Sequence, residues 1–210
     1  MLYRRESNSI ISCENFLPKP FVDKLYIDLL NAQSRFGVSN WATNEIDDSK
    51  EFFSHYCGGF DFWITEPEQT KGVEEIAKLK NWFFHQGLFR FAESERMSNY
   101  SVLTRKCKHH IHVVAYNNGG YYNWHKDMTN GNIFTFNLIL NKGTEKLKGG
   151  DMLFMDDGER VQISNQNNLM VVFPTHVDHA ITPIVSENNK DVAFAEQRFS
   201  IQFWVHFDVQ

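Results

Sequence analysis

His125 and Asp127 stand one residue apart in the segment AYNNGGYYNWHKD, residues 115–127. If this segment is extended, side chains alternate between faces with a period of two, so the imidazole and the carboxylate project to the same side. Such a pair can bind one metal ion, but a stable site needs a third ligand. His179, in the later segment HAITPI, is the residue that the sequence offers.

Two histidines and one carboxylate that leave coordination positions open are the ligand set of non-haem Fe(II) oxygenases. The His-x-Asp pattern alone is weak evidence, because a chain with nine His can match it by chance, and a solvated acid in a surface turn explains it as well. Its context is more informative, since the pair follows a Gly-Gly turn and precedes the apolar run NIFTFNLIL at 132–140. This places the pair at the mouth of a predicted barrel, where ligand sites tend to form.

Further segments extend the pattern in a fixed order over about residues 110–207. They are YNNGGYYNWHKD, FTFNLILN, GGDMLF, HAITPI and RFSIQFW. In this order they resemble the 2-oxoglutarate- and Fe(II)-dependent dioxygenases, and in particular their prolyl-4-hydroxylase-like branch. The segment ENFLPKPFVDKL near the start is a looser match. The resemblance implies a double-stranded β-helix, which is a jelly-roll barrel like that of the cupins.

The resemblance also implies roles for five residues. His125, Asp127 and His179 would bind Fe(II). Arg198 would bind the distal carboxylate of 2-oxoglutarate, and Tyr116 would hydrogen-bond the same group, although a purely structural phenol remains the alternative for Tyr116. A guanidinium can engage a carboxylate through two parallel N–H···O bonds, which fixes orientation as well as charge. The implied reaction uses O2 and 2-oxoglutarate to hydroxylate a C–H bond, with ascorbate as a further candidate cofactor.

Two features depart from the family pattern. The interval between His179 and Arg198 is longer than usual, so SENNKDVAFAEQ must form an inserted loop, and Lys190 within it is a rival anchor for 2-oxoglutarate. The setting RFSIQFW favours Arg198. His176 is a rival for His179, but an offset of three on a strand points the two rings to opposite faces. The HAITPI context favours His179 as the ligand.

The substrate is less defined by the sequence than the metal. The resemblance suggests a prolyl residue in a peptide or protein, a free amino acid or another small molecule. Residues close to the predicted ligands in sequence or on the polar face of the last strand are the expected substrate contacts: Asn117, Tyr121, Tyr122, Trp124 and Trp204. The aromatic segment from Gly37 to Pro67 is either a substrate lid or ordinary core.

The elements that must position these residues differ between the two halves of the chain. We expect one α+β domain over 1–210, with a helix-rich support and lid in 1–100 and a jelly-roll catalytic core in 101–210. The first half should hold a strand and an amphipathic helix within 10–33, a strand at 60–65 and a long helix from about 68 to 98. Gly87 is a candidate break within that long helix. The second half has short apolar runs separated by Asn, Gly and Asp. The predicted strands are 110–116, 132–140, 151–155, 168–173, 180–185 and 198–207.

Composition excludes several other classes of protein. The net charge of −5 and the pI near 6.0 give no basic footprint for nucleic acid. Three widely spaced cysteines, Cys13, Cys57 and Cys107, argue against a disulfide framework. The N-terminus lacks an apolar signal region and no window has the length of a membrane span. We therefore expect a cytoplasmic enzyme without a membrane or nucleic-acid partner; the sequence does not indicate its oligomeric state.

Two other readings of the sequence stay open. One is a jelly-roll binding module without catalysis, and the other is a Zn or Mn hydrolase or isomerase on a similar barrel, which would not need Arg198. A second metal site through His110 and His112 is a weaker alternative, because the sequence places no carboxylate or cysteine beside them to complete it. A strand edge with a solvated basic run explains that segment better.

Overall fold

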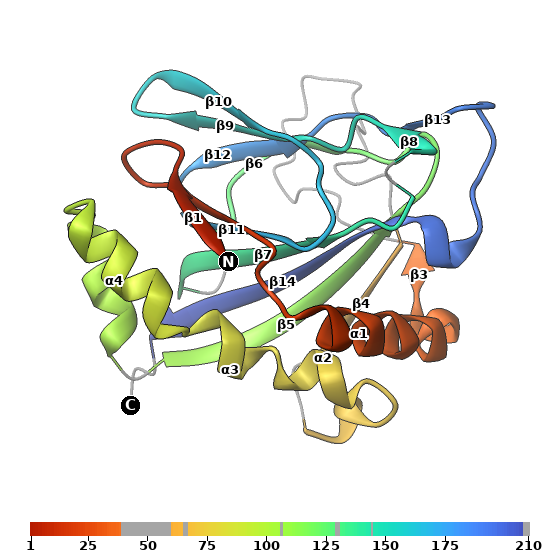
Figure 1. Ribbon diagram of the computed structural model, residues 1–210, viewed down its shortest axis with the longest axis horizontal. Helices are drawn as coiled ribbons and strands as arrows, with labels where there is room; N and C mark the ends of the chain where they lie inside the picture. Colours follow the sequence, from red (N-terminus) through yellow and green to blue (C-terminus); the bar gives the residue numbers. More distant parts are fainter. Residues whose placement is uncertain (39–59, 65–66, 106, 129–130, 144, 208–210) are drawn as a thin grey trace, which may run out of the picture.

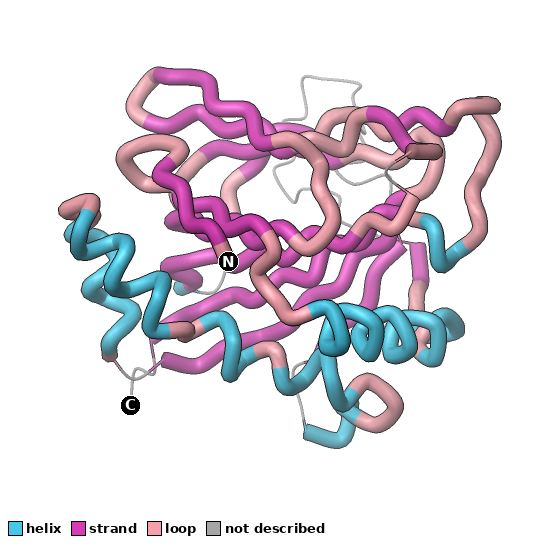
Figure 2. Tube along the Cα trace, in the orientation of Figure 1, coloured by secondary structure: helices cyan, strands magenta, loops and turns pink. Residues whose placement is uncertain are grey.

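The computed structural model describes residues 1–38, 60–64, 67–105, 107–128, 131–143 and 145–207. In this part of the chain three layers lie on one another. A small antiparallel sheet faces a large one, and the helices cover the other face of the large sheet (Figure 1). The trace coloured by secondary structure shows the same separation of strands and helices (Figure 2). The α+β fold predicted from the sequence is confirmed, and the paired strands of its sheets are antiparallel.

The large sheet contains strands from both halves of the chain. Its order is β1 (Leu2–Arg5), β2 (Ile11–Glu14), β11 (Leu169–Pro174), β7 (Asn132–Leu140), β14 (Arg198–Phe207), β5 (Cys107–Tyr116), β4 (Phe60–Ile64) and β3 (Gly37–Val38). The first hundred residues, expected to be a helix-rich support, thus also supply the strands at both edges. In doing so they cover the outer edges of β11 and β5, which would otherwise expose unpaired backbone groups.

The small sheet carries two of the predicted metal ligands. Its order is β10 (Glu159–Ile163), β9 (Met152–Asp156), β12 (Asp178–Ile181) and β6 (Tyr122–His125), and a separate pair joins β8 (Leu147–Lys148) to β13 (Val185–Ser186). Along the chain, β5, β7, β11 and β14 of the large sheet alternate with strands of the small sheet. Within the described residues, backbone hydrogen bonds do not join the two sheets into a closed barrel, so the closed barrel that the sequence suggested is not observed.

The alternation predicted for the last strand decides what lies on each side of the large sheet. Phe199, Ile201, Phe203 and Val205 belong to the main core together with helix residues. The opposite face of β14 carries Arg198, Ser200, Gln202 and Trp204, all buried between the sheets. Side chains thus alternate faces along the strand, as pleating requires. The face turned toward the small sheet is therefore polar, and the face turned toward the helices is apolar.

In the part of the chain that the structure describes, the helices are four short segments accompanied by 3-10 turns. They are α1 (Lys19–Asn31), α2 (Glu74–Lys78), α3 (Lys80–Phe83) and α4 (Gln86–Ser94), with 3-10 turns at Gln33–Arg35, Pro67–Thr70, Ser98–Thr104 and Phe194–Glu196. None of the described helices combines the length and apolar character needed to cross a membrane.

The long helix expected from about 68 to 98 is not continuous: it is divided into α2, α3 and α4, and the last division lies at His85, two residues before the candidate break at Gly87. His85 has an extended backbone, with φ −65° and ψ 133°, and its side chain accepts a hydrogen bond from the Gly87 backbone N–H at 3.0 Å. This side chain caps a new helix in the manner of an N-cap residue. The apolar residues around Trp82 pack on the core from short, separately oriented turns, which a periodicity argument cannot distinguish from one continuous helix.

Candidate metal centre

The structure brings His125, Asp127 and His179 together. The last residue of β6, His125, pairs directly with His179 of β12 in the antiparallel register. Asp127 follows β6, and its backbone N–H donates to the Thr175 carbonyl at 3.0 Å. One potential ligand atom from each side chain lies within 4.8 Å of the others. Cross-strand pairing and one loop hydrogen bond thus produce the geometry that the sequence spacing only suggested.

Both imidazole rings are oriented by backbone carbonyls. His125 Nδ1 lies 2.7 Å from the Asn123 carbonyl, and His179 Nδ1 lies 3.0 Å from the Val177 carbonyl. A carbonyl oxygen can only accept, so each Nδ1 carries the proton and each Nε2 keeps its lone pair. The two Nε2 atoms lie 3.6 and 3.5 Å from the Asp127 carboxylate oxygens. They are buried and have no hydrogen-bond partner within the described residues, an arrangement that fits a bound metal ion.

The surroundings favour neutral imidazoles, the form that binds metals. Burial, followed by the neighbouring His179, lowers the pKa of His125 from its ordinary value to about 3. Phe173 packs beside the His179 ring with centroids 4.6 Å apart. His179 and Asp127 are therefore largely shielded from solvent, at 2% and 3% exposed.

The carboxylate of Asp127 is held by a residue that sequence reasoning missed. Thr135 Oγ1 on β7 donates to Asp127 Oδ2 at 2.6 Å. Thr135 and Asn137 are polar positions two residues apart in the otherwise apolar run NIFTFNLIL. That alternation would have marked both residues as facing a polar space. It could not have shown which carboxylate Thr135 contacts.

Arg198 and Tyr116 meet at neighbouring ends of β14 and β5. They are paired in the register, both are fully buried, and the Arg198 guanidinium carbon lies 5.2 Å from the Tyr116 ring centroid. Arg198 Nε donates to the Gly150 carbonyl at 3.0 Å and Nη1 donates to Ser200 Oγ at 2.7 Å. These contacts fix the plane of the guanidinium between the two sheets.

The rivals of His179 and Arg198 lie elsewhere. His176 and Lys190 are both exposed. The inserted segment before Arg198 contains β13 and a 3-10 turn, and the Ser186 hydroxyl accepts a hydrogen bond from the Lys190 backbone N–H at 2.8 Å. The structure thus contains the predicted insertion and leaves the Lys190 side chain at its surface.

The residues predicted to contact the substrate differ in burial and in what they touch. Tyr122 is buried and its ring stacks on His125 with centroids 3.8 Å apart, whereas Trp124 is 43% exposed. Asn117 uses its side chain to hold the inserted loop, since Asn117 Oδ1 accepts from the Val192 backbone N–H at 2.8 Å. Trp204 lies opposite Thr135 on the inner face of the large sheet. Tyr122 therefore contacts the triad directly, and Trp204 lies beside the residue that holds Asp127.

The remaining expectations have mixed outcomes. Most of the proposed Gly37–Pro67 lid lies outside the described residues.

His112 was expected to lack a carboxylate partner, and this is wrong: His112 Nε2 lies 3.0 Å from Asp61 Oδ2 on the adjacent strand β4. Asp61 is distant from His112 in the chain, so local sequence patterns did not indicate it as a neighbour. Cys13 is buried and free.

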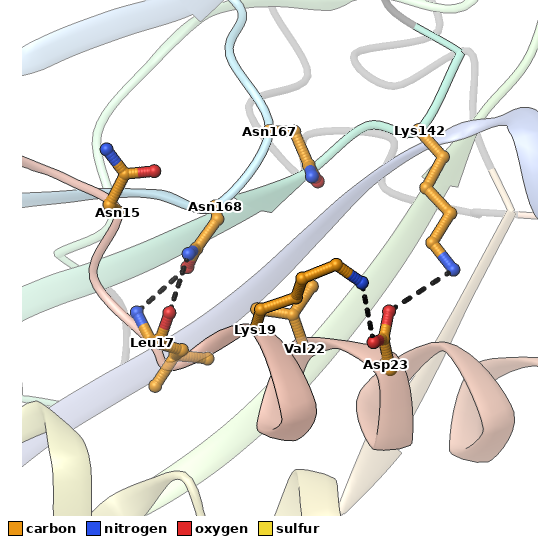
Figure 3. A pocket seen from close by; sticks show the side chains of 8 residues that line it. All are labelled: Asn15, Leu17, Lys19, Val22, Asp23, Lys142, Asn167 and Asn168. Carbon is orange, nitrogen blue, oxygen red and sulfur yellow. Dashed lines mark hydrogen bonds and ion pairs between the residues drawn. The ribbon is translucent and has the colours of Figure 1, made fainter.

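A surface hollow elsewhere has no connection with the triad. It is lined by residues of the α1 entry and of two loops, and contacts between the lining residues themselves hold it together (Figure 3). Lys19 Nζ lies 2.9 Å from Asp23 Oδ2, and Leu17 exchanges two backbone hydrogen bonds with the Asn168 side chain. None of the triad residues lines this hollow, so it is not part of the candidate centre.

Comparison with known proteins agrees with the site. Residues 111–206 match the sequence model of the 2OG-Fe(II) oxygenase superfamily. No curated protein sequence matches the chain significantly. Among solved structures, a Pseudomonas putida prolyl-4-hydroxylase is 18% identical with a TM-score of 0.63, covering 94% of this chain and 92% of its own. A Trichoplax adhaerens prolyl hydroxylase is 17% identical with a TM-score of 0.65, covering 95% and 84%. At these identities the likeness concerns the fold.

The matched region and the triad together define the class. Residues 111–206 belong to the 2OG-Fe(II) oxygenase superfamily, and the protein is an enzyme of that family. The family and the His-x-Asp…His triad imply Fe(II) and 2-oxoglutarate as its metal and cosubstrate.

Proposed function

We propose that this enzyme hydroxylates a C–H bond of an amino-acid-type substrate, with a prolyl residue in a peptide or protein as the leading candidate. The observation that carries the proposal is the pair of buried, unpartnered Nε2 atoms of His125 and His179 facing the Asp127 carboxylate. Two neutral imidazoles and one carboxylate suit Fe(II) and leave positions for a chelating cosubstrate. Iron with 2-oxoglutarate supplies the oxidising chemistry when both are bound.

We assign the distal carboxylate of 2-oxoglutarate to Arg198, with Tyr116 beside it. Gly150 and Ser200 hold the guanidinium in one plane, and a fixed guanidinium can bind a carboxylate through two parallel hydrogen bonds. Because the guanidinium lies between the sheets, the attraction is weakly screened by solvent. Arg198 would therefore set both the affinity and the direction of the cosubstrate.

The sheet pair is proposed to be an open double-stranded β-helix. Strands β5, β7, β11 and β14 on one side and β6, β9, β10 and β12 on the other alternate along the chain in the manner of a jelly roll. In this arrangement the triad and Arg198 face the same inner space from opposite layers. The prolyl assignment draws its support from fold likeness to prolyl hydroxylases. One of these, from Trichoplax adhaerens, was solved with a peptide fragment of hypoxia inducible factor.

Spectroscopy and product analysis test the function in sequence. Anaerobic addition of Fe(II) and 2-oxoglutarate should produce a weak visible metal-to-ligand band, and O2 should then yield succinate. Asp127→Gly should abolish hydroxylation because it removes one of three metal ligands. Folded wild-type protein that gives neither band nor succinate would contradict the oxygenase assignment and favour a Zn or Mn enzyme or a binding module.

A further inference from the structure

Three polar side chains form a row across the inner face of the large sheet. Asn137 of β7 is in register with Gln202 of β14, and Gln202 is in register with His112 of β5. Asp61 of the next strand, β4, closes the row through its contact with His112. Asn137, Gln202 and His112 are at most 3% exposed. Burying such groups costs free energy unless hydrogen bonds compensate, so the row needs an explanation that core packing does not give.

Gln202 is held at one end only. His112 Nδ1 lies 3.0 Å from Gln202 Oε1, while His112 Nε2 lies 3.0 Å from Asp61 Oδ2. The Asp61 carboxylate anchors the imidazole, and the imidazole anchors one end of the Gln202 amide. The other end of that amide makes no hydrogen bond within the described part of the chain. Gln202 therefore presents a fixed polar group to the inner space.

Asn137 has the same incomplete pairing. Its Nδ2 lies 3.3 Å from the Met152 sulfur, which is a weak acceptor. Its Oδ1 is fully buried without a partner among the described residues. Leaving a buried acceptor unsatisfied costs about 1–3 kcal/mol. A ligand that donates to this oxygen would remove the penalty.

The two free ends point to an amide group as their complement. In the assigned orientations Asn137 offers an acceptor and Gln202, its cross-strand neighbour, offers a donor. A carboxylate accepts only, so 2-oxoglutarate cannot satisfy both residues. A peptide or carboxamide group carries an N–H and a C=O and can satisfy both. If His112 donates from Nε2 to Asp61 and accepts at Nδ1, Gln202 donates to it through Nε2 and presents Oε1 instead. The free ends of Asn137 and Gln202 are then both acceptors, and the N–H of the ligand amide is the group that serves them.

The position of the row suits the molecule that is oxidised. Asn137 is two residues along β7 from Thr135, or about 7 Å, and Thr135 holds the Asp127 carboxylate. Trp63 stacks on His112 with centroids 4.1 Å apart, and Trp204 lies edge-on to Trp63 at 5.0 Å. The row thus combines hydrogen-bonding groups with flat aromatic surfaces. Aromatic faces of this kind pack well against aliphatic rings.

We propose that Asn137 and Gln202 bind an amide group of the substrate, with Asp61 and His112 positioning Gln202, so that the enzyme selects peptide-type substrates. The proposal deepens the proposed function and depends on it. The selected feature is the amide itself, because an ester of the same shape lacks the N–H that one of the two residues requires.

Binding measurements on matched ligands test the proposal. The probes are a blocked proline-containing tripeptide and a series in which each amide nitrogen in turn is replaced by an ester oxygen. They are titrated calorimetrically into protein loaded anaerobically with Mn(II) and 2-oxoglutarate. Wild type should bind the tripeptide about tenfold more tightly than one of the esters, which is the effect of one lost hydrogen bond.

Two variants remove the free polar ends while preserving side-chain volume. Gln202→Met and Asn137→Leu should each bind the tripeptide about tenfold more weakly and lose the discrimination against the ester. Gln33→Met, at an exposed position in a 3-10 turn, should leave both affinities unchanged. Melting temperatures measured alongside report on folding, and a shorter amide such as Gln202→Asn provides a second variant that keeps polarity at the same position.

Each outcome decides the question. Absence of tripeptide binding, or equal binding of amide and ester by wild type, overturns the proposal, as does discrimination that survives in both variants. A lowered melting temperature with unchanged discrimination means that the two amides bond to each other and serve structure alone. The visible band and succinate formation, measured on the same wild-type preparation, separate this failure from a failure of the proposed function.

Discussion

Asp127 depends on one hydroxyl group for its orientation. Thr135 donates to Asp127 Oδ2 at 2.6 Å from the facing sheet. Partners that hold metal-binding carboxylates commonly contribute 10–100-fold to metal affinity. Thr135→Val keeps the shape of the side chain and removes the donor, so we predict that Fe(II) affinity falls by roughly tenfold or more.

Anaerobic Fe(II) titration measures this effect. Thr104→Val is the matched control, since Thr104 is exposed and donates only to a local carbonyl at 2.7 Å. Unchanged Fe(II) affinity in Thr135→Val would show that Asp127 is oriented by the backbone alone.

Gly150 is required for two separable reasons. Its φ is +73°, and a Cβ there would lie 2.9 Å from Arg198 Cδ. Gly158 has a φ of +83°, but a Cβ there would have no atom within 4 Å. Ala at either position incurs left-handed strain of about 1–2 kcal/mol. We predict that only Gly150→Ala displaces the guanidinium, weakening 2-oxoglutarate binding while Gly158→Ala does not.

Titration of the visible band with 2-oxoglutarate compares the two glycine variants. Urea unfolding of both proteins measures the shared strain. Equal 2-oxoglutarate affinity in the two variants would contradict the assignment of Arg198 to the cosubstrate.

At the scale of elements, a buried carboxylate connects two helices. Asp28 of α1 accepts hydrogen bonds from the backbone N–H groups of Glu75 and Ile76 in the first turn of α2, at 2.7 and 3.0 Å. It thereby caps a helix from outside that helix's own sequence. We predict that Asp28→Ala lowers the free energy of unfolding by about 1–3 kcal/mol.

Urea unfolding monitored by circular dichroism measures the loss. Asp23→Ala on the same helix is the control, because the Asp23 side chain is 47% exposed and forms ion pairs with Lys19 and Lys142 at the surface. Its effect should stay below about 1 kcal/mol. Equal losses in the two variants would show that the inter-helix contact adds no stability.

At the scale of the whole molecule, the ligands are expected to tie the two layers together. The triad histidines lie on the small sheet, while Thr135 and Arg198 lie on the large one. A ligand that binds only the folded state stabilises it by about 2.7 kcal/mol at a concentration 100 times its Kd. We predict that Fe(II) with 2-oxoglutarate raises the melting temperature by about 5–10 °C under anaerobic conditions.

A chelator should reverse the stabilisation, and Asp127→Gly should show little of it. Differential scanning fluorimetry in an anaerobic chamber measures both. A melting temperature that is indifferent to the metal in wild type would argue against a ligand site between the layers.

The sequence by itself determined much of the β architecture and the triad. The strand predicted at 132–140 has the same bounds as β7 in the structure. The alternation of side chains along the last strand correctly placed Arg198 and Phe199 on opposite faces of β14. The spacing of His125 and Asp127, with the apolar strand that follows, identified the metal pair. These features are local, because strand period and turn chemistry depend on residues close together in the chain.

Only the tertiary structure decided which distant residues meet. Thr135 on Asp127, Asp61 on His112 and the Asn137–Gln202 pair all depend on cross-strand register. Register is set by the packing of whole sheets, so a shift of one residue would turn every side chain to the other face. The end of one helix and the start of the next at His85 likewise depend on how the separate helical turns pack on the core. Local patterns therefore defined the elements and two of the proposed metal ligands, whereas long-range packing decided what surrounds them.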